Sequence, residues 1–431
     1  MMPSSVTAIK VLPSASRLVH SLRDLGYGFP QAVADIIDNS VAAGATAISV
    51  DLRFDGPDSW LRIADNGSGM NGDAVTEAMR YGTKQSYEED ALGKFGLGLK
   101  TASLSQCRQL SVASRTSERT RIQIRKLDLD HVLDSDRWEI FALEPGRCDE
   151  RLIEPLEHAS GTVVLWQSLD RVLGYKVPTG KRARAALDSL AEQLDLHLGM
   201  TFHRFLSGEV EGRKRLRIKV NGSSISPWDP FARDETATET LPGCDIEVAT
   251  SETVGLTRFQ PFVLPPRERF STEEAFHRHS GPRKWNAQQG FYIYRANRMI
   301  QSGGWCRMRA LDEHVKLARA SIDFYPGLDP AFEVDVSKAR AVLPAELRER
   351  LQAPVESLVR AAQAAYRAHS SGHSDSPALK TTSRKSTHGR LTGARPALES
   401  AARQAGEASS LQRIIRQLRK SDPRMAEQLG W

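Results

Sequence analysis

The residues best suited to chemistry begin at Asp65, in the glycine cluster DNGSGM. Gly67 and Gly69 allow a tight turn and leave room for a flat ring. The Asp65 carboxylate could accept a hydrogen bond from an exocyclic amine, and the soft Met70 side chain could pack against the same ring. The cluster therefore predicts a purine site, although an Asx-rich turn is the commoner origin of such a hexamer taken alone.

A second glycine cluster, GKFGLG at Gly93–Gly98, is followed by a predicted helix over Leu97–Ser105. Its glycines leave a row of backbone N–H groups unobstructed, and bare amides that lead into a helix N-terminus bind anions. A flexible loop before a helix is the competing interpretation. Between the two clusters lies a polar loop, Tyr81–Leu92, which could close over a ligand, with Gly82 and Gly93 as hinge candidates.

Upstream, the stretch AVADIIDNSVAAGAT at Ala32–Thr46 has apolar residues at helical spacing. Asp35 and Asn39 are four residues apart and so share another face of this helix. Asp35 could accept a proton from a water molecule, and the Asn39 amide oxygen could ligate Mg²⁺. The alternative is a solvated polar face that ends at Gly44.

These motifs occur in a characteristic order: DIIDNS, DNGSGM, a polar loop, GKFGLG, and SGTVVLW at Ser160–Trp166. In this order they resemble the GHKL ATPase superfamily, whose members include gyrase B, the ninety-kilodalton heat-shock chaperone, MutL and histidine kinases. The resemblance implies a Bergerat-type α/β sandwich that binds ATP and Mg²⁺ and hydrolyses ATP. It makes Asp35 the general base, Asn39 the Mg²⁺ ligand and Asp65 the residue that reads adenine. It assigns the other ATP contacts to Gly67, Gly69, Met70, Thr83, Gly93, Lys94, Phe95, Gly96, Leu97, Gly98 and Thr162.

One residue departs from the superfamily pattern, in which the base is usually Glu. Asp35 is shorter by one methylene. It could therefore act through an extra water, Asp38 could share its role, or hydrolysis could be slow, and the sequence leaves these three alternatives open. Thr162 falls on the hydroxyl that supports the adenine-reading Asp through water.

The composition is that of a soluble globular protein, with 40% hydrophobic and 26% charged residues among 431. The sequence has no apolar run of membrane-spanning length and no signal-peptide pattern. Its four cysteines are far apart and form no CxxC pair, which argues against a zinc site and suits a reducing compartment. We therefore expect a cytoplasmic protein.

The sequence predicts an α+β protein whose ATPase domain covers residues 14–170. In dimerising GHKL proteins the N-terminal segment crosses to the partner subunit, and residues 1–30 are the candidates for that exchange here. A first helix is expected over Leu18–Leu25. Strands are expected over Ala47–Phe54, Trp60–Ala64, Leu110–Ser114, Arg121–Leu127, Trp138–Leu143 and Thr162–Trp166.

A second α+β domain is expected over residues 171–368. GFYIYRANRMIQSGGW at Gly290–Trp305 and FEVDVSKARAVLP at Phe332–Pro344 resemble the ribosomal-S5-like transducer domain of MORC proteins and their prokaryotic relatives. The expected elements are a helix over Arg182–Phe205, a hairpin of Leu216–Val220 and Ser223–Ile225, and strands over Asp245–Val254, Thr257–Val263, Phe291–Arg295 and Phe332–Val336.

Lys338 follows the last of these expected strands. Transducer domains have a Lys or Arg there that reaches the γ-phosphate of ATP in the neighbouring domain. An ammonium group at that place can offset charge on a departing phosphoryl group. The alternatives are an exposed loop lysine, or Arg340 in the same role.

The net charge of +6 originates in the C-terminal tail, because the chain from Ser370 onward has 11 Lys or Arg and 5 Asp or Glu. Residues 369–431 are predicted to be mostly disordered. Within them, SLQRIIRQLRK at Ser410–Lys420 reads as a basic amphipathic helix. It could dock on a partner protein, bind a phosphate backbone, or have no partner.

The resemblance favours a MORC- or MutL-like ATPase that dimerises on ATP and closes as a clamp around DNA, in genome maintenance or phage defence. The alternative is an ATP-dependent chaperone like the ninety-kilodalton heat-shock protein, for which the sequence offers no large client-binding domain. A histidine kinase would carry a phosphoacceptor-His helix hairpin before the ATPase domain, and His20 lacks that context.

Overall fold

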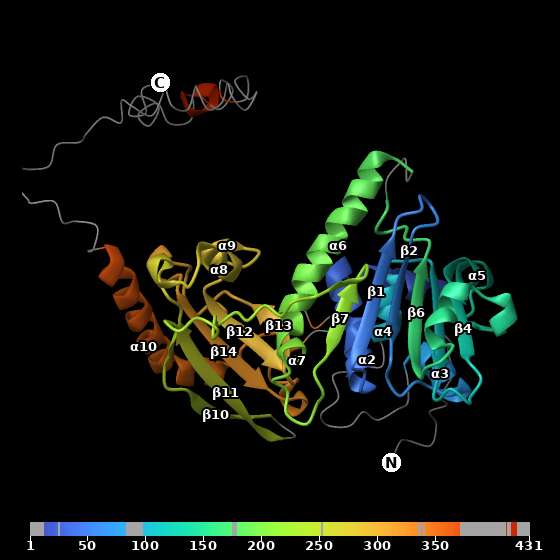
Figure 1. The fold of residues 1–431 in the computed structure, drawn as a ribbon, viewed down its shortest axis with the longest axis horizontal. Helices are drawn as coiled ribbons and strands as arrows, with labels where there is room; N and C mark the ends of the chain where they lie inside the picture. The colour runs from blue at the N-terminus through green and yellow to red at the C-terminus, as the bar shows by residue number, and fades with distance from the viewer. Residues whose placement is uncertain are drawn as a thin grey trace, which may run out of the picture. The chain divides into compact units, whose positions relative to one another are not determined.

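The computed structural model describes residues 13–24, 26–82, 98–174, 179–250, 253–334, 338, 341–370, 411 and 415–419. Two sheets organise the unit that ends at His373, and each sheet is covered by helices (Figure 1). The rest of the chain is a separate unit, in which residues 411 and 415–419 are helical, within the predicted Ser410–Lys420 helix.

Among the described residues the first sheet has eight strands, in the order β5-β4-β3-β6-β2-β1-β7-β8. Its strands are β1 (Ala47–Arg53), β2 (Trp60–Asp65), β3 (Gln109–Arg115), β4 (Gln123–Asp128), β5 (Phe141–Leu143), β6 (Gly161–Gln167), β7 (Arg217–Val220) and β8 (Ser223–Ser224). The helices of this part are α1 (Ala15–Arg23), α2 (Phe29–Ala42), α3 (Gly72–Met79), α4 (Gly98–Leu104) and α5 (Leu129–Ser135), with 3₁₀ turns η1 (Pro145–Arg147), η2 (Glu150–Leu152) and η3 (Glu154–Leu156).

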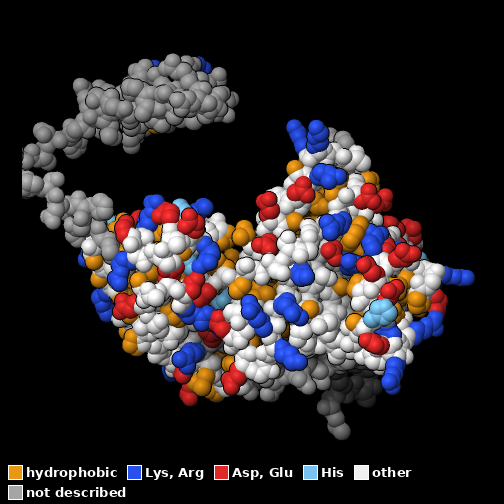
Figure 2. Space-filling view, in the orientation of Figure 1, with side chains coloured by type: hydrophobic (Ala, Val, Ile, Leu, Met, Phe, Trp, Pro, Cys, Tyr) orange, Lys and Arg blue, Asp and Glu red, His pale blue; other side chains and the backbone are white. Residues whose placement is uncertain are grey.

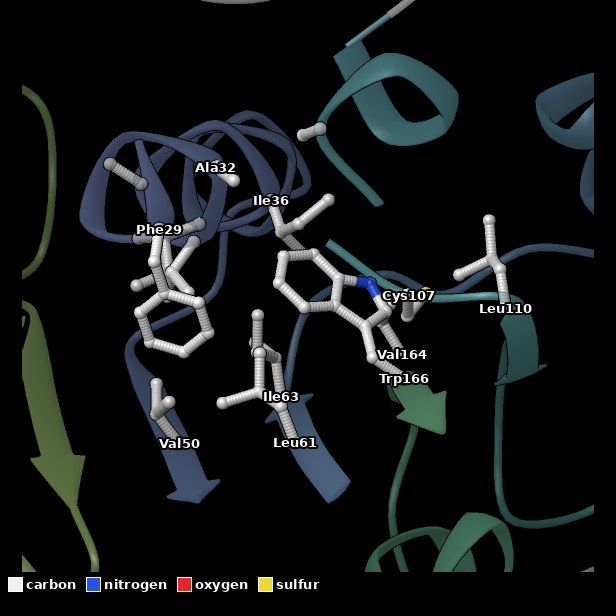
Figure 3. Packing of buried hydrophobic residues seen from close by; sticks show 14 of the residues in the cluster. Phe29, Ala32, Ile36, Val50, Leu61, Ile63, Cys107, Leu110, Val164 and Trp166 are labelled. Atoms are coloured by element: carbon white, nitrogen blue, oxygen red, sulfur yellow. The ribbon is translucent and has the colours of Figure 1, made fainter. Parts of the chain in front are cut away.

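Helix α2 is held against this sheet by its apolar face. Figure 3 shows Phe29 and Ile36 of α2 above Val50 of β1 and Ile63 of β2. The Phe29 ring meets Trp166 of β6 edge-on, with ring centroids 6.4 Å apart. Burying large aromatic and aliphatic side chains on both elements fixes how α2 is rotated, and so where its polar residues point.

The hairpin of Leu216–Val220 and Ser223–Ile225 was expected in the second domain, and that expectation is wrong. β7 pairs in parallel with β1, with Ile218 opposite Ile48, and so extends the first sheet. The physical reason is that Ile218 and Val220 continue the buried face of β1 and belong to the same apolar core. The alternation of apolar and polar residues along a strand identifies the face that is buried, but not the sheet that the strand joins.

Helix α6 (Lys181–Thr201) and the short α7 (His203–Ser207) connect β6 to β7 of the first sheet, and the chain passes to the second sheet after β8. Leu187, Leu194 and Leu198 of α6 pack in the first core, whereas Met200 belongs to the second. A single helix therefore contributes to both cores.

The second sheet runs in the order β10-β11-β14-β12-β13, with β9 paired to β11, in the part of the chain that the structure describes. Its strands are β9 (Glu239–Thr240), β10 (Cys244–Ala249), β11 (Val254–Val263), β12 (Gly290–Arg295), β13 (Arg298–Ser302) and β14 (Ala318–Phe324). The helices here are α8 (Glu273–His279), α9 (Lys284–Ala287) and α10 (Ala345–Ser370), and the 3₁₀ turns are η4 (Arg267–Arg269), η5 (Glu313–Val315) and η6 (Pro326–Leu328). Leu347, Leu351 and Leu358 of α10 are buried in this second core.

The strand expected over Phe332–Val336 does not form in its described residues. Phe332 and Glu333 lie in a turn, and the Phe332 ring stacks on Phe324 with centroids 3.9 Å apart. Packing of this ring on β14 thus replaces strand pairing. Residues 335 and 336 lie outside the described residues.

Two features predicted from composition can be compared with the structure. No described helix has the length and apolar character needed to cross a membrane. The four cysteines are all free thiols, with Cys107 buried in the first core.

A prediction concerns Gly161, the first residue of β6, which lies against the backbone at the end of β2. Its φ is +147°, and an added Cβ would lie 1.9 Å from the Asp65 carbonyl oxygen. We expect Gly161→Ala to lower the free energy of unfolding by at least about 2 kcal/mol, as measured by chemical denaturation. Gly146→Ala is the matched control, because an added Cβ there meets nothing within 4 Å. Equal stability of the two variants would show that the close approach is not needed.

Candidate nucleotide site

The carboxylate of Asp65, at the end of β2, is already held by three donors. Its Oδ2 accepts from the Ser40 hydroxyl at 2.7 Å, and its Oδ1 accepts from the amides of Gly67 at 2.9 Å and Thr162 at 3.2 Å. Burial raises the pKa of the Asp65 carboxyl, while these three hydrogen bonds act in the opposite direction. Because a carboxylate has about four acceptor positions, roughly one remains for an incoming donor such as an exocyclic amine.

Ser114 of β3 connects the turn after β2 to β6. Its Oγ accepts from the Met70 amide at 2.8 Å, donates to the Gly161 carbonyl at 2.9 Å, and lies 2.9 Å from the Thr162 hydroxyl. The Thr162 hydroxyl thus bonds to Ser114, and it is the Thr162 amide that contacts Asp65. At Gly69, φ is +66° and an added Cβ would lie 2.0 Å from the Arg115 carbonyl oxygen, so only glycine fits there.

Helix α2 presents Asp35 and Asn39 differently. Asp35 is 1% exposed, whereas Asn39, one turn later, is exposed. The Asp35 Oδ2 accepts a hydrogen bond from the Tyr27 hydroxyl at 2.9 Å. It also lies 3.7 Å from the position that a Cβ on Gly98 would occupy, at the start of α4. The end of the second glycine cluster is therefore beside the predicted base.

Two cations of the second domain reach the same part of α2. The Lys338 Nζ lies 2.7 Å from Asp38 Oδ2 and 3.4 Å from Asp35 Oδ1. The Arg298 Nε lies 3.2 Å from Asp38 Oδ1, and its Nη2 lies 3.6 Å from Asp35 Oδ1. No side chain of the four is more than 7% exposed. Lys338 is therefore buried against α2 and is not an exposed loop lysine.

The charges around Asp35 act in opposite directions on its proton affinity. Burial is the main influence and raises the pKa of the Asp35 carboxyl above its ordinary value. The Asp38 charge also raises it, whereas Lys338, Arg298 and the Tyr27 hydrogen bond lower it. A carboxylate whose pKa is raised towards neutrality is a better proton acceptor than an ordinary aspartate.

The residues present fit a Mg²⁺ ion coordinated mainly by phosphates and water. Asn39 offers an exposed amide oxygen one helical turn from Asp35, and hard oxygen donors of this kind suit Mg²⁺. Asp38, by contrast, is engaged with Lys338 and Arg298 and is fully buried. Asn39 is therefore the better candidate ligand of the two neighbours.

Several predicted site residues lie outside the described residues. These are Thr83, Gly93, Lys94, Phe95, Gly96 and Leu97, together with residues 1–12, Arg340 and all of the polar loop after Gly82. Among the described ones, the structure brings Asp65, Gly67, Gly69, Met70 and Thr162 together at one end of β2. It places Asp35, Gly98 and Lys338 beside one another along α2.

Four further residues of the site were not anticipated from the sequence: Tyr27, Ser40, Ser114 and Arg298. Ser40 directly follows Asn39 in DIIDNS, so its place in the motif could have identified it. Tyr27 lies in a glycine-flanked turn before α2, which is a weaker signal. Ser114 and Arg298 lie within strands and have no local pattern that sets them apart.

Residues 27–162 match the family model described as "Histidine kinase-, DNA gyrase B-, and HSP90-like ATPase". The matched stretch contains α2 and β2, which carries Asp65, and it ends at Thr162. This part of the chain is therefore an ATPase domain of the GHKL superfamily.

The chain is also similar to DNA mismatch repair proteins. The chain is 32% identical over 137 residues to the DNA mismatch repair protein MutL of Cellvibrio japonicus, and 31% identical over 155 residues to that of Pectobacterium atrosepticum. These regions make up 31% and 35% of this chain, but 19% and 20% of the relatives. The chain thus matches about a fifth of the length of these proteins, and the likeness is confined to a region the size of the ATPase domain.

The geometry predicts that Asp65→Asn weakens nucleotide binding. The amide can present N–H groups where the carboxylate presented only acceptors, which leaves a buried donor facing a donor. We expect the affinity for a non-hydrolysable ATP analogue, measured by calorimetry, to fall by about 10- to 100-fold. Asp58→Asn, at an exposed position before β2, should bind as the unaltered protein does. Unchanged affinity in Asp65→Asn would remove this residue from the adenine site.

Proposed function

We propose that this protein is a Mg²⁺-dependent ATPase whose nucleotide site is completed by a lysine from its second domain. The observation that carries the proposal is the contact of Lys338 with both Asp35 and Asp38 on helix α2. The family match of residues 27–162 supports ATP as the ligand. The transducer-like identity of the second domain belongs to the same proposal.

Each described residue then has a definite task. Asp65 accepts the adenine amine, and Ser40, Gly67 and Thr162 keep its carboxylate aligned for that bond. Asp35 accepts the proton of the attacking water, with Tyr27 fixing one of its oxygens. Lys338 offsets charge on the terminal phosphoryl group. When bound, Mg²⁺ neutralises charge on the phosphates, and Asn39 is its protein ligand.

We further propose that ATP closes a homodimeric clamp and that DNA is the partner. The printed name of the MutL relatives, DNA mismatch repair protein, supports DNA, and the motifs Gly290–Trp305 and Phe332–Pro344 support a MORC- or MutL-like arrangement. On the face drawn in Figure 2, basic and acidic side chains are interspersed. The basic excess lies by sequence from Ser370 onward, where a positive segment suits a phosphate backbone.

The first prediction from this function separates binding from hydrolysis. Asp35→Asn removes the proton acceptor and should slow ATP hydrolysis by roughly 10²-fold, with affinity for the ATP analogue nearly unchanged. Asn39→Ala should weaken nucleotide binding in the presence of Mg²⁺ and have little effect without it. Steady-state turnover and calorimetry with and without Mg²⁺ measure these effects. Normal turnover in Asp35→Asn, together with loss of turnover in Asp38→Asn, would move the base to Asp38.

The second prediction concerns assembly. Only a triphosphate supplies the terminal phosphate for Lys338, so only the triphosphate analogue should give a compact dimer in light scattering. Lys338→Ala should weaken that response without changing ADP affinity, and Lys214→Ala, at an exposed lysine, is the control. If light scattering gives the same mass and the same radius without nucleotide, with ADP and with the triphosphate analogue, the clamp is excluded.

The partner is tested in the same preparations by ATP turnover. Added duplex DNA should raise the turnover, and an unfolded protein client should not. Stimulation by the client alone would favour the chaperone alternative over the DNA clamp.

A further inference from the structure

We propose that Arg298 is a positioning residue whose positive charge compensates the negative charge of Asp38, so that Lys338 can leave the α2 carboxylates for a nucleotide phosphate. This inference rests on the proposed function, in which Lys338 senses the terminal phosphate. It adds a role for Arg298, to which neither the motifs nor the comparisons assign one, and gives Asp38 a role other than that of a base. It also makes the contact of Lys338 with α2 a resting position and not its working one.

The two cations hold the carboxylates in different ways. Arg298 bonds with Nε to Asp38 at 3.2 Å and with Nη1 to the main-chain carbonyls of Lys338 at 2.9 Å and Met299 at 3.4 Å. Its guanidinium is therefore fixed at several points. Lys338 holds Asp38 through one ammonium group at the end of a flexible stem. A rigid fork that is bonded to the backbone stays in place, whereas a single ammonium can exchange one oxygen partner for another.

The charge count explains why Arg298 matters to Lys338. Asp35 and Asp38 carry two negative charges, and Arg298 and Lys338 carry two positive ones, so the resting cluster is neutral. When Lys338 moves to a phosphate, one uncompensated negative charge remains. Without Arg298, two uncompensated negative charges would remain among side chains that are at most 7% exposed. Leaving a buried charge unpaired is strongly unfavourable, so Lys338 would stay where it is.

The other groups beside the cluster cannot replace that charge. His197 of α6 lies near Arg298 and Asp38. Burial, together with the positive charge of Arg298, lowers the pKa of His197 to about 4. It is therefore neutral at pH 7. Tyr27 contributes a neutral hydroxyl donor to Asp35. Among the described groups in contact with Asp38, the compensating charge comes from Arg298 once Lys338 has left.

The backbone at Lys338 is consistent with a position set by its surroundings. Its φ is +47°, in the left-handed region that residues other than Gly, Asn and Asp rarely adopt. Such conformations persist where surrounding contacts hold them, and they concentrate at functional sites. The hydrogen bond from Arg298 to the Lys338 carbonyl is one such contact.

The test compares three variants by the ratio of the ADP dissociation constant to that of a non-hydrolysable ATP analogue, measured by calorimetry with Mg²⁺. Arg298→Gln should lower this ratio by about tenfold or more, because Lys338 no longer leaves Asp38. The double variant Asp38→Asn/Arg298→Gln restores the wild-type charge count, so its ratio should return to within about threefold of wild type. Arg298→Lys keeps the charge but not the fixed guanidinium, so its ratio should lie between those of Arg298→Gln and the wild type.

Two outcomes would overturn the proposal. An unchanged ratio in Arg298→Gln would mean that Arg298 has no influence on Lys338. A double variant as impaired as Arg298→Gln would mean that Arg298 acts only through the Lys338 backbone. Arg350→Gln, which breaks an exposed pair with Glu346 on α10, is the control and should leave the ratio unchanged. If Arg298→Gln does not fold, the double variant still decides, because a ratio well below the wild-type value in that variant would overturn the proposal.

Failure of the proposed function gives a different result. If the wild-type protein binds ADP and the triphosphate analogue equally, phosphate sensing by Lys338 fails, whatever Arg298 does. The pairing of Arg298 with Asp38 is then judged by thermal unfolding without nucleotide. The double variant should lose less in melting temperature than the sum of Asp38→Asn and Arg298→Gln, and additive losses would overturn the pairing itself.

Discussion

The burial of helix α2 between the first sheet and the second domain is the constraint on which the rest of the site depends. One face of the helix is fixed by Phe29 and Ile36 against the sheet core. This packing also fixes the orientation of the other faces of α2. Ser40 therefore contacts Asp65, and Asp35 and Asp38 contact the cations of the second domain. A change in the rotation of α2 would therefore disturb the contacts of Asp65, of Asp35 and of the second domain together.

The ion cluster on α2 contributes more to specificity than to stability. Transferring four charges out of water is unfavourable, and their mutual attraction offsets this only when every partner is present. Apolar residues of the same size would join the domains at least as firmly. What the charges provide is a contact that a further anion can change, since a phosphate competes for the same ammonium group that Asp35 and Asp38 hold.

The parts of the site that could be predicted from the sequence are those encoded within a few residues. Asp35 and Asn39 share a helix, and Asp65, Gly67 and Gly69 share one turn, so spacing and residue type are enough. Contacts made across the fold could not be found in this way. Arg298 meets Asp38 across 260 positions, and nothing near Arg298 in sequence shows that it is buried and paired. The prediction that the hairpin of β7 and β8 belongs to the second domain was wrong for a related reason. The alternation of apolar and polar residues along β7 is equally compatible with either sheet. Strand β14 carries the fully buried Arg319 as its second residue, which obscures its apolar pattern.

The proposed function also accounts for an aspartate, Asp35, at the position where the superfamily usually has a glutamate. A shorter side chain keeps its carboxylate close to α2, where Tyr27 holds Oδ2 and Lys338 approaches Oδ1. Both oxygens are thus engaged before any nucleotide binds. The space beside Oδ2 is bounded by Gly98, where even a methyl group would come within 3.7 Å. In the proposed function, withdrawal of Lys338 towards a phosphate would release Asp35 Oδ1 to accept a hydrogen bond from water when the substrate is in place. Under that proposal the shorter base and the lysine act together, because only the terminal phosphate draws Lys338 away and so allows proton transfer to Asp35.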